Sequence, residues 1–319
     1  PLDPTTGYSR GTINSGCVRN RGYELEITAT PVLTRDFRWN TTLTWSKNDN
    51  KILSLAEGAD ENQVISTVGT ASIIGRVGGT TGDLWGYKLV RDPEGNVIIG
   101  DNGLPEQADE IEYVGTAYAD WKAGWYNEFS YKGFKLGILL DGQVGGTIYS
   151  MSFHKMMEQG KLTQSLNGRL PGTEYYMDAN DPRIAAAGYT PQSGMYMIAP
   201  GVVRNDDGTF SPNTKVVTIE SFYKEYYRRA NVETNSFDAS FLKIREIRLE
   251  YELPKKVLEK SPFSKASIAV YGRNLWCFTD YPLFDPESVA LDGSSMVSGI
   301  ETGSLPTTRT FGFNLNLTF

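Results

Sequence analysis

The chain ends in Phe311-Gly312-Phe313-Asn314-Leu315-Asn316-Leu317-Thr318-Phe319, where apolar and polar residues alternate without a break. Successive side chains of a β-strand point to opposite faces, so this alternation predicts a strand with one apolar and one polar face. A terminal strand of this kind is typical of bacterial outer-membrane barrels, whose assembly machinery recognises it. We expect the assembly signal to lie in Phe311, Gly312, Phe313, Leu315, Leu317 and Phe319.

The composition agrees with a barrel and argues against other classes of protein. The 319 residues include 33 Gly and 18 Tyr and carry a formal net charge of -7. No basic patch collects on one element, so we expect no binding to nucleic acid. No apolar run approaches the roughly 18 residues that a membrane helix needs. The sequence also shows no secretory signal, so we expect the C-terminal part of a longer precursor.

Alternation with a period of two residues predicts seven strands. They span about 20–30, 37–48, 120–131, 134–144, 240–253, 265–276 and 311–319. In the fifth strand, Leu242 and Ile244 fall on the charged side of the alternation, which predicts a bulge or an exit from the lipid band. Seven strands cannot close a barrel with large loops, so the remaining strands must come from elsewhere in the precursor or from another chain.

The connections between these strands are unequal in length. Those at 31–36, 132–133 and 254–264 are short, and those at 49–119, 145–239 and 277–304 are long. Outer-membrane barrels have short periplasmic turns and long extracellular loops, so we expect the long connections outside the cell. Within them, the sequence predicts a hairpin whose arms 84–90 and 97–99 flank a turn at 92–96, and a short amphipathic helix in 218–230.

Several short motifs occur in one order along the chain. They include Arg19-Asn20-Arg21-Gly22-Tyr23-Glu24, Trp85-Gly86-Tyr87, Asp101-Asn102-Gly103-Leu104-Pro105, Asp141-Gly142-Gln143, Tyr271-Gly272-Arg273-Asn274-Leu275-Trp276 and Asp285-Pro286-Glu287. Together they resemble the C-terminal barrel region of the SusC/RagA family of TonB-dependent outer-membrane transporters, and the resemblance covers nearly the whole chain.

The resemblance implies an all-β fold, in which residues 1–319 form about the last seven strands of one antiparallel transmembrane barrel of about 22 strands. The N-terminal plug and the earlier strands would lie outside this chain. It also implies import of glycan or peptide nutrients, energised through TonB, with a SusD-like surface lipoprotein as partner and outer-membrane lipid around the wall. Two alternatives stay open: a passive or structural outer-membrane barrel, and a secreted β-sandwich that binds glycans.

The sequence offers little for catalysis or metal binding, and we expect neither an enzyme nor a cofactor. His154 is the only histidine, and no G-x-S-x-G pattern accompanies it. The acidic stretches 92–96, 178–181 and 206–208 contain oxygen ligands but lack the spacing of a calcium loop, so turn chemistry explains them better. Cys17 and Cys277 are expected to stay unpaired.

Aromatic residues supply the candidate ligand contacts. The tryptophans of the strands are expected at the membrane interfaces, whereas aromatic residues of the long loops lie where a substrate would enter. The loop candidates are Trp85, Tyr149, Tyr175, Tyr176, Tyr196, Phe222 and Tyr223. Packing within the loops and contact with the lipoprotein are the alternative explanation for them. The charges on the polar faces of the strands are expected to pair with the plug or across the wall. They are Glu246, Arg248, Glu250, Glu252 and Arg273.

Overall fold

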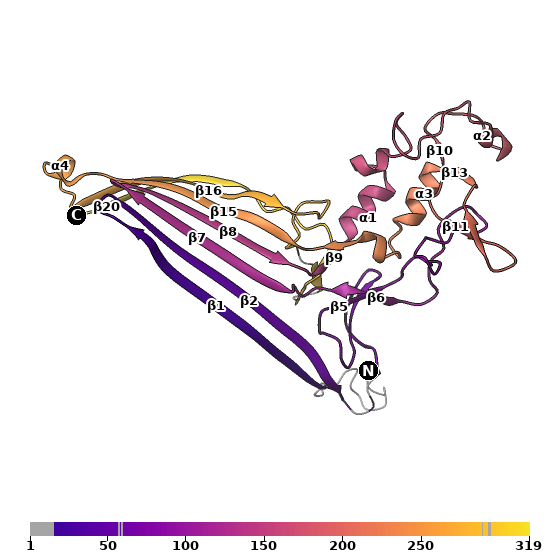
Figure 1. The fold of residues 1–319 in the computed structure, drawn as a ribbon, viewed down its shortest axis with the longest axis horizontal. Coiled ribbons are helices and arrows are strands. Elements are labelled where there is room, and N and C mark those ends of the chain that lie inside the picture. The colour runs from indigo at the N-terminus through magenta and orange to yellow at the C-terminus, as the bar shows by residue number, and fades with distance from the viewer. Residues whose placement is uncertain (1–15, 57, 59, 289, 293–294) are drawn as a thin grey trace, which may run out of the picture.

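The computed structural model describes residues 16–56, 58, 60–288, 290–292 and 295–319, so part of the predicted 1–319 segment, including residues 1–15, lies outside the described residues. A seven-stranded antiparallel sheet, called here the wall, runs through the molecule (Figure 1). Its strands in spatial order are β1 (Gly16–Leu33), β2 (Phe37–Leu55), β7 (Trp121–Tyr131), β8 (Phe134–Val144), β15 (Phe241–Glu252), β16 (Lys265–Phe278) and β20 (Thr310–Thr318). All seven predicted strands are confirmed.

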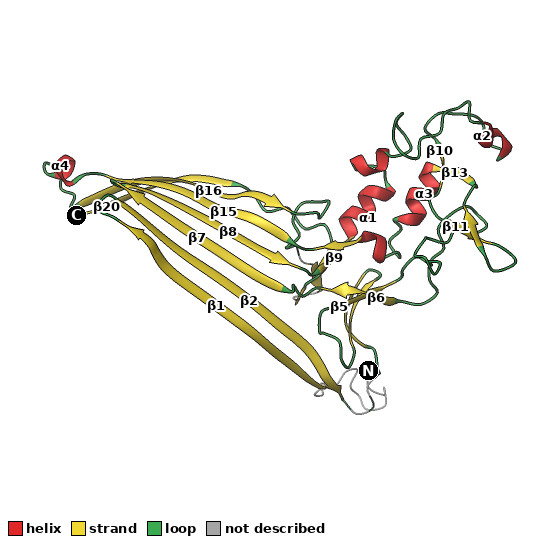
Figure 2. Cartoon of the chain, viewed as in Figure 1, coloured by secondary structure: helices red, strands yellow, loops and turns green. Residues whose placement is uncertain are grey.

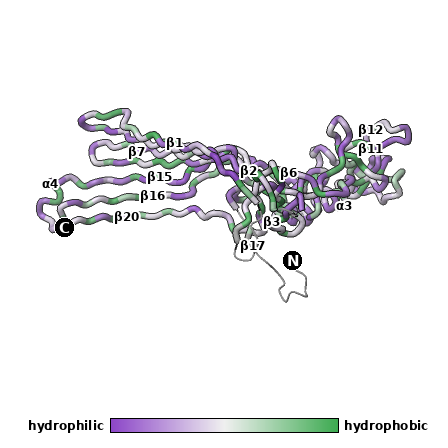
Figure 3. Tube along the Cα trace, turned by 90° about the horizontal axis from the view of Figure 1, so that it is seen from below, coloured by the Kyte–Doolittle hydropathy of each residue, from purple (hydrophilic) through white to green (hydrophobic). Residues whose placement is uncertain are grey.

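The wall has one continuous apolar face, because antiparallel partners in register lie on the same side of a sheet. One row across all seven strands consists of Val32, Trp39, Phe129, Leu136, Leu249, Val270 and Phe313. The neighbouring row, on the other face, includes Asn40, Glu128 and Arg248. Figure 3 shows the resulting change between apolar and polar residues along each strand. The alternation therefore separates a lipid-type face from a water-type face.

The predicted irregularity in the fifth strand is a bulge at Arg245. The pairing of β15 shifts between Ile244 and Glu246 against both of its neighbours. Because of this shift, Ile244 pairs with Leu140, which lies on the apolar face of β8. The extra residue thus returns Leu242 and Ile244 to the apolar side. Asn274 on β16 lies opposite the bulge and adopts a left-handed backbone with φ of 51°.

Short turns join the strands at the end of the wall where the chain finishes, and long connections emerge at the other end (Figure 2). The turn after β15 contains the short helix α4 (Lys255–Leu258). We call the described residues of 56–120, 145–240 and 279–309 the loop layer. Its helices are α1 (Met151–Glu158), η2 (Thr163–Leu166), α2 (Pro182–Ala186), α3 (Ile219–Tyr226) and η3 (Glu233–Asn235).

The loop layer also contains small sheets. Its strands are β3 (Gln63–Val68), β4 (Ala71–Gly75), β5 (Asp83–Gly86), β6 (Glu112–Thr116), β9 (Thr147–Ser150), β10 (Tyr196–Ile198), β11 (Val202–Arg204), β12 (Phe210–Pro212), β13 (Val216–Thr218), β14 (Ser236–Asp238), β17 (Ala290–Asp292), β18 (Ser295–Val297) and β19 (Ile300–Glu301). Strands β3 to β6 form one sheet, and β14, β9 and β19 form another. These sheets give the connections a packed structure of their own.

The predicted loop hairpin is only partly correct. The turn at 92–96 exists, since the Asp92 amide donates to the Asn96 carbonyl over 2.9 Å and the Ile98 amide donates to Val90 over 2.9 Å. The first part of the predicted arm 84–90 pairs elsewhere, because β5 lies between β4 and β6. The helix predicted in 218–230 is confirmed as α3.

Candidate functional site

The polar face of the wall carries paired charges. Arg273 donates to Glu246 over 2.6 Å, and Arg248 donates to Glu250 over 2.6 Å. Lys135 on the neighbouring strand lies 3.9 Å from Glu250. The expected charge pairs across the wall therefore exist between β15 and its two neighbours, and Arg248 and Glu250 form a further pair within β15. A water-filled or plugged lumen tolerates such pairs, whereas hydrocarbon would not.

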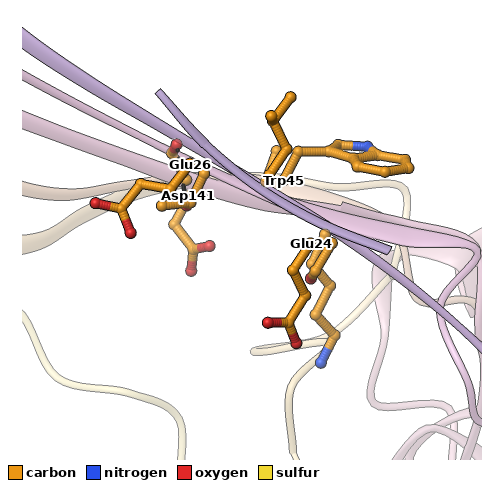
Figure 4. Close-up of a pocket in the computed structure, with 10 residues that line it drawn as sticks. Glu24, Glu26, Trp45 and Asp141 are labelled. Atoms are coloured by element: carbon orange, nitrogen blue, oxygen red, sulfur yellow. Dashed lines mark hydrogen bonds between the residues drawn. The ribbon is translucent and has the colours of Figure 1, made fainter. Parts of the chain in front are cut away.

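A hollow in this face lies on strands β1, β2, β7 and β8 (Figure 4). The carboxylates of Glu24, Glu26 and Asp141 lie on one side of the sheet, and the Trp45 ring lies on the other. Among the described residues, no group of three or more His, Cys, Asp or Glu side chains is arranged to hold a metal ion. Glu24, Glu26, Lys122 and Asp141 give the hollow a charged lining.

A buried ion network ties the last connection to the wall. The Lys243 ammonium lies 2.6 Å from Asp285 and also contacts Glu287, and Arg245 bridges Glu287 and Asp141. Burial opposes the charge of Asp285, but hydrogen bonds from Lys243 and Thr307 outweigh it and hold its pKa below the usual range. The bulge therefore places Lys243 and Arg245 of β15 next to Asp285 and Glu287 of the last connection.

A second buried acid, Glu301, ties the same connection to helix α1. Its carboxylate accepts hydrogen bonds from the Ser150 hydroxyl over 2.7 Å and from the Ser152 hydroxyl over 2.8 Å. The backbone amide of Ser304 also donates to it, over 2.9 Å. Ser150 is the N-cap of α1 and accepts from the Phe153 amide over 3.0 Å. The acid therefore joins β19, β9 and α1 at one point.

Helix α3 organises the aromatic part of the loop layer. It begins at the Thr218 cap, which accepts from the Ser221 amide over 3.1 Å, and Lys224 pairs with Glu220 one turn earlier. Its apolar side enters a core formed by Ile99, Phe153, Met157, Met197, Ala199, Val217, Ile219, Phe222 and Tyr223. Full burial of one Val, Ile, Phe or Met side chain contributes about 1.5–3 kcal/mol to the stability of the fold.

The structure divides the seven loop aromatics predicted from the sequence. Tyr149, Tyr196, Phe222 and Tyr223 are buried in the loop layer, and Trp85, Tyr175 and Tyr176 are partly exposed. Packing explains the buried four in this arrangement of the loops. Ligand binding by any of the seven stays a prediction.

A pocket of about 440 Å³ brings three of these aromatics together. Tyr175, Phe222 and Tyr223 line it, whereas Trp85, Tyr149, Tyr176 and Tyr196 do not. The rest of the lining is Thr163, Gln164, Leu166, Asn167, Thr173, Pro200, Tyr226 and Tyr227. Sequence reasoning missed the segment 163–167, because nothing in its local pattern indicates that it folds back onto α3.

The remaining polar candidates have structural explanations. Asp92 accepts from the amides of Glu94 and Asn96, and Asp207 accepts from the Thr209 amide, as in ordinary turns. Cys17 and Cys277 are free. In the ranges described, no helix combines the length and hydrophobicity required to traverse a bilayer.

The terminal strand has the exposed apolar face that an assembly signal needs. Phe311, Phe313, Leu315, Leu317 and Phe319 are exposed, and Gly312 pairs with Tyr271 on β16. The Phe319 ring packs against Phe263 with centroids 5.1 Å apart. Recognition of this strand by an assembly machinery stays a prediction.

The chain is similar to known receptors. No protein-family model matches it. It is 26% identical to TonB-dependent receptor P3 of Formosa agariphila, covering 100% of this chain and 30% of that receptor. It is 24% identical to TonB-dependent receptor P26 of the same organism, covering 98% of this chain and 30% of that receptor. It is also 26% identical to TonB-dependent receptor SusC of Bacteroides thetaiotaomicron, over 43% of this chain and 15% of SusC.

Solved structures agree on the fold. The RagAB peptide importer in its closed-closed state superposes with a TM-score of 0.64 at 15% identity, covering 100% of this chain and 31% of that chain. The open-open state gives a TM-score of 0.62. The chain thus spans about a third of the length of the proteins that it matches from end to end.

These relatives are TonB-dependent receptors, which are outer-membrane β-barrel proteins and not enzymes, as expected for this chain. The fold is the predicted one, a transmembrane antiparallel barrel segment with long loops. The resemblance expected from the sequence is confirmed: along its whole length the chain is similar to a β-barrel portion of the TonB-dependent receptors of the SusC/RagA type.

Proposed function

We propose that this chain forms part of the wall and the outer loops of a TonB-dependent importer of glycan, or peptide, nutrients across the bacterial outer membrane. The observation that carries the proposal is one sheet with an apolar face, an ion-paired polar face and a packed loop layer at one end. A barrel wall needs the two faces, and a receptor needs the structured loops.

In this proposal, residues 1–319 are the C-terminal part of one barrel, and the plug and the earlier strands belong to the rest of the receptor. The loop layer faces the cell exterior and meets a SusD-like surface lipoprotein, as in a SusCD-type complex. TonB acts through the N-terminal part. The edges of the wall, β1 and β20, would pair with the strands that complete the barrel.

The substrate class is the finer part of the proposal. RagAB is a peptide importer by name, and the chain shares its fold at low identity. The family resemblance favours glycan over peptide. Both are nutrients too large for simple diffusion, so either one fits an energised importer.

The test is uptake by cells that carry the complete receptor. Cells with the receptor should accumulate labelled oligosaccharides or peptides, and cells without TonB function or treated with a protonophore should not. Loss of uptake on deleting the neighbouring lipoprotein would support the two-component complex. Uptake that persists without TonB and without a proton gradient would instead favour the passive barrel and contradict the importer.

A further inference from the structure

The pocket beside α3 differs in charge from three other hollows in the part of the chain that the structure describes. None of the described residues that line it is charged. The hollow on the other side of α3 is lined by Lys155, Glu158 and Arg169 among others, and the wall hollow contains Glu24 and Glu26. A charged ligand entering the pocket beside α3 would lose water and would meet no charged side chain in the described lining. Its occupant should therefore be neutral.

The aromatic rings of this pocket are held in fixed positions. Tyr223 stacks on Tyr227 with centroids 5.9 Å apart, and Phe222 stacks on Tyr226 at 5.3 Å. The Tyr223 hydroxyl donates to the backbone carbonyls of Gln164 and Asn167, over 3.0 and 3.1 Å. These bonds fix the 163–167 segment against α3. Preorganised rings bind a flat apolar face with little loss of side-chain entropy.

Hydrogen-bonding groups accompany the rings. Gln164, Asn167, Tyr226 and Tyr227 belong to the lining. Their side-chain amide nitrogens and hydroxyls make no hydrogen bond to another residue in the described ranges. Tyrosine hydroxyls are neutral at physiological pH, and burial raises the pKa of Tyr226 and of Tyr227 further. Uncharged donors beside apolar rings suit a ligand that has hydroxyl groups around an apolar ring face.

The backbone around the pocket argues against an extended peptide. The described lining comes from η2, α3 and irregular segments, and none of it belongs to a strand. One common mode of peptide binding adds a strand to an exposed sheet edge. The lining residues described offer no strand for that mode.

We propose that the pocket beside α3 binds an uncharged sugar ring, with Tyr175 and Tyr226 contacting the ring face and Gln164 and Asn167 binding its hydroxyls. The pocket has a volume of about 440 Å³, which lies in the range of about 300–1,000 Å³ of small-ligand sites. This inference deepens the proposed function, on which it rests for the import step, by naming neutral glycans as the substrate class.

The experiment uses the complete receptor, purified in detergent and applied to an array of neutral and acidic oligosaccharides together with short peptides. We expect neutral oligosaccharides to bind, and calorimetry should give a Kd that changes little between about 0.05 and 0.5 M salt. Acidic oligosaccharides and peptides should not compete for this site. Binding confined to charged ligands would overturn the inference.

Variants locate the site. Tyr175→Ala should weaken binding by about tenfold through loss of the ring contact, and Gln164→Ala should weaken it by about threefold to tenfold. Gln164→Ala removes only a side chain, because the contact from Tyr223 uses the backbone carbonyl. Tyr118→Ala is the matched control, since Tyr118 is a 38% exposed tyrosine of the loop layer outside this lining.

The outcomes separate the two proposals. Unchanged affinity in both pocket variants would overturn the pocket inference, even if TonB-dependent uptake of glycans persists. Loss of affinity in the pocket variants, with no TonB-dependent uptake by the wild-type receptor, would support the pocket and contradict the import function. Near-ultraviolet circular dichroism would show whether each variant keeps the wild-type tyrosine packing.

Discussion

Lys243 lies between two carboxylates of the last connection, and its side chain is only 4% exposed. Replacing it with methionine would leave Asp285 buried without its cation. We expect Lys243→Met to destabilise the attachment of this connection by about 3–5 kcal/mol. Hydrogen exchange measured by mass spectrometry should therefore rise in residues 279–288.

The control for Lys243 is Lys215, whose pair with Asp101 lies at the surface with the lysine side chain 42% exposed. Lys215→Met should leave exchange in 279–288 unchanged, because exposed pairs contribute little. Combining Lys243→Met with Asp285→Leu should restore part of the lost protection, since no unpaired buried carboxylate then remains. Equal exchange in wild type and Lys243→Met would contradict the anchoring role.

His154 makes the loop layer sensitive to acid. Its ring is 1% exposed, Nδ1 donates to the Tyr227 carbonyl over 2.6 Å, and Nε2 lies 3.7 Å from Glu158. Burial lowers the His154 pKa, and Lys155 and Arg229 lower it further, against the opposing effects of the Tyr227 carbonyl and Glu158. The folded state therefore disfavours protonation of the His154 ring.

The sign of the pH effect follows from this shift. The unfolded chain takes up a proton below pH about 6.5, whereas the folded state does so only at lower pH. The stability that neutral His154 contributes to the loop layer should be fully present above pH about 6.5. It should be lost as the pH falls from there towards the lowered pKa of the folded state. Thermal unfolding of wild type and His154→Asn between about pH 5 and 7.5 tests this. The same slope in both proteins would contradict it.

Strand β20 tests the assignment of the two faces. Phe313 is 76% exposed and lies in the apolar row, whereas Asn316 lies on the polar face opposite Ser267. Phe313→Lys should cost about 2–4 kcal/mol if the residue faces lipid near the middle of the bilayer. Asn316→Lys should be tolerated because it faces the polar side. Heat-modifiable migration of the complete receptor on gels measures folding, and equal tolerance of both lysines would reject the assignment.

The strands could be predicted because each one exposes its two faces to different solvents, so a period of two appears in the sequence. Arg245 was detectable indirectly, since Leu242 and Ile244 fall out of phase. The parts of β1 and β2 next to the loop layer were missed because polar residues such as Asp49 and Asn50 resemble a loop, although they continue the hairpin. At the loop-layer end of β1 and β2, the backbone pairing continues although the side chains no longer alternate between apolar and polar.

The pocket beside α3 could not be predicted in the same way. Tyr223 lies 56 residues from Asn167 in sequence, and the hydrogen bond that joins them leaves no local pattern. For the same reason Tyr149 and Tyr196 looked like surface aromatics. Long connections with several small cores conceal which of their aromatic residues are buried.

The orientation of the whole molecule can be tested by lysine labelling of intact cells. The two ends of the wall carry different exposed lysines. Lys161 and Lys215 lie in the loop layer, and Lys255 and Lys256 lie in the α4 turn at the other end. If the loop layer faces outside, a membrane-impermeant amine reagent should label the first pair in intact cells. It should label Lys255 and Lys256 only after the outer membrane is permeabilised.

Mass spectrometry of the labelled peptides reads out both ends from one sample, so each end serves as the control for the other. The short turns would then lie in the periplasm, as the unequal lengths of the connections predict. Labelling of the α4 lysines in intact cells, with protection of Lys161 and Lys215, would reverse the orientation. The pocket beside α3 would then face the periplasm, where it could not make the first contact with a nutrient.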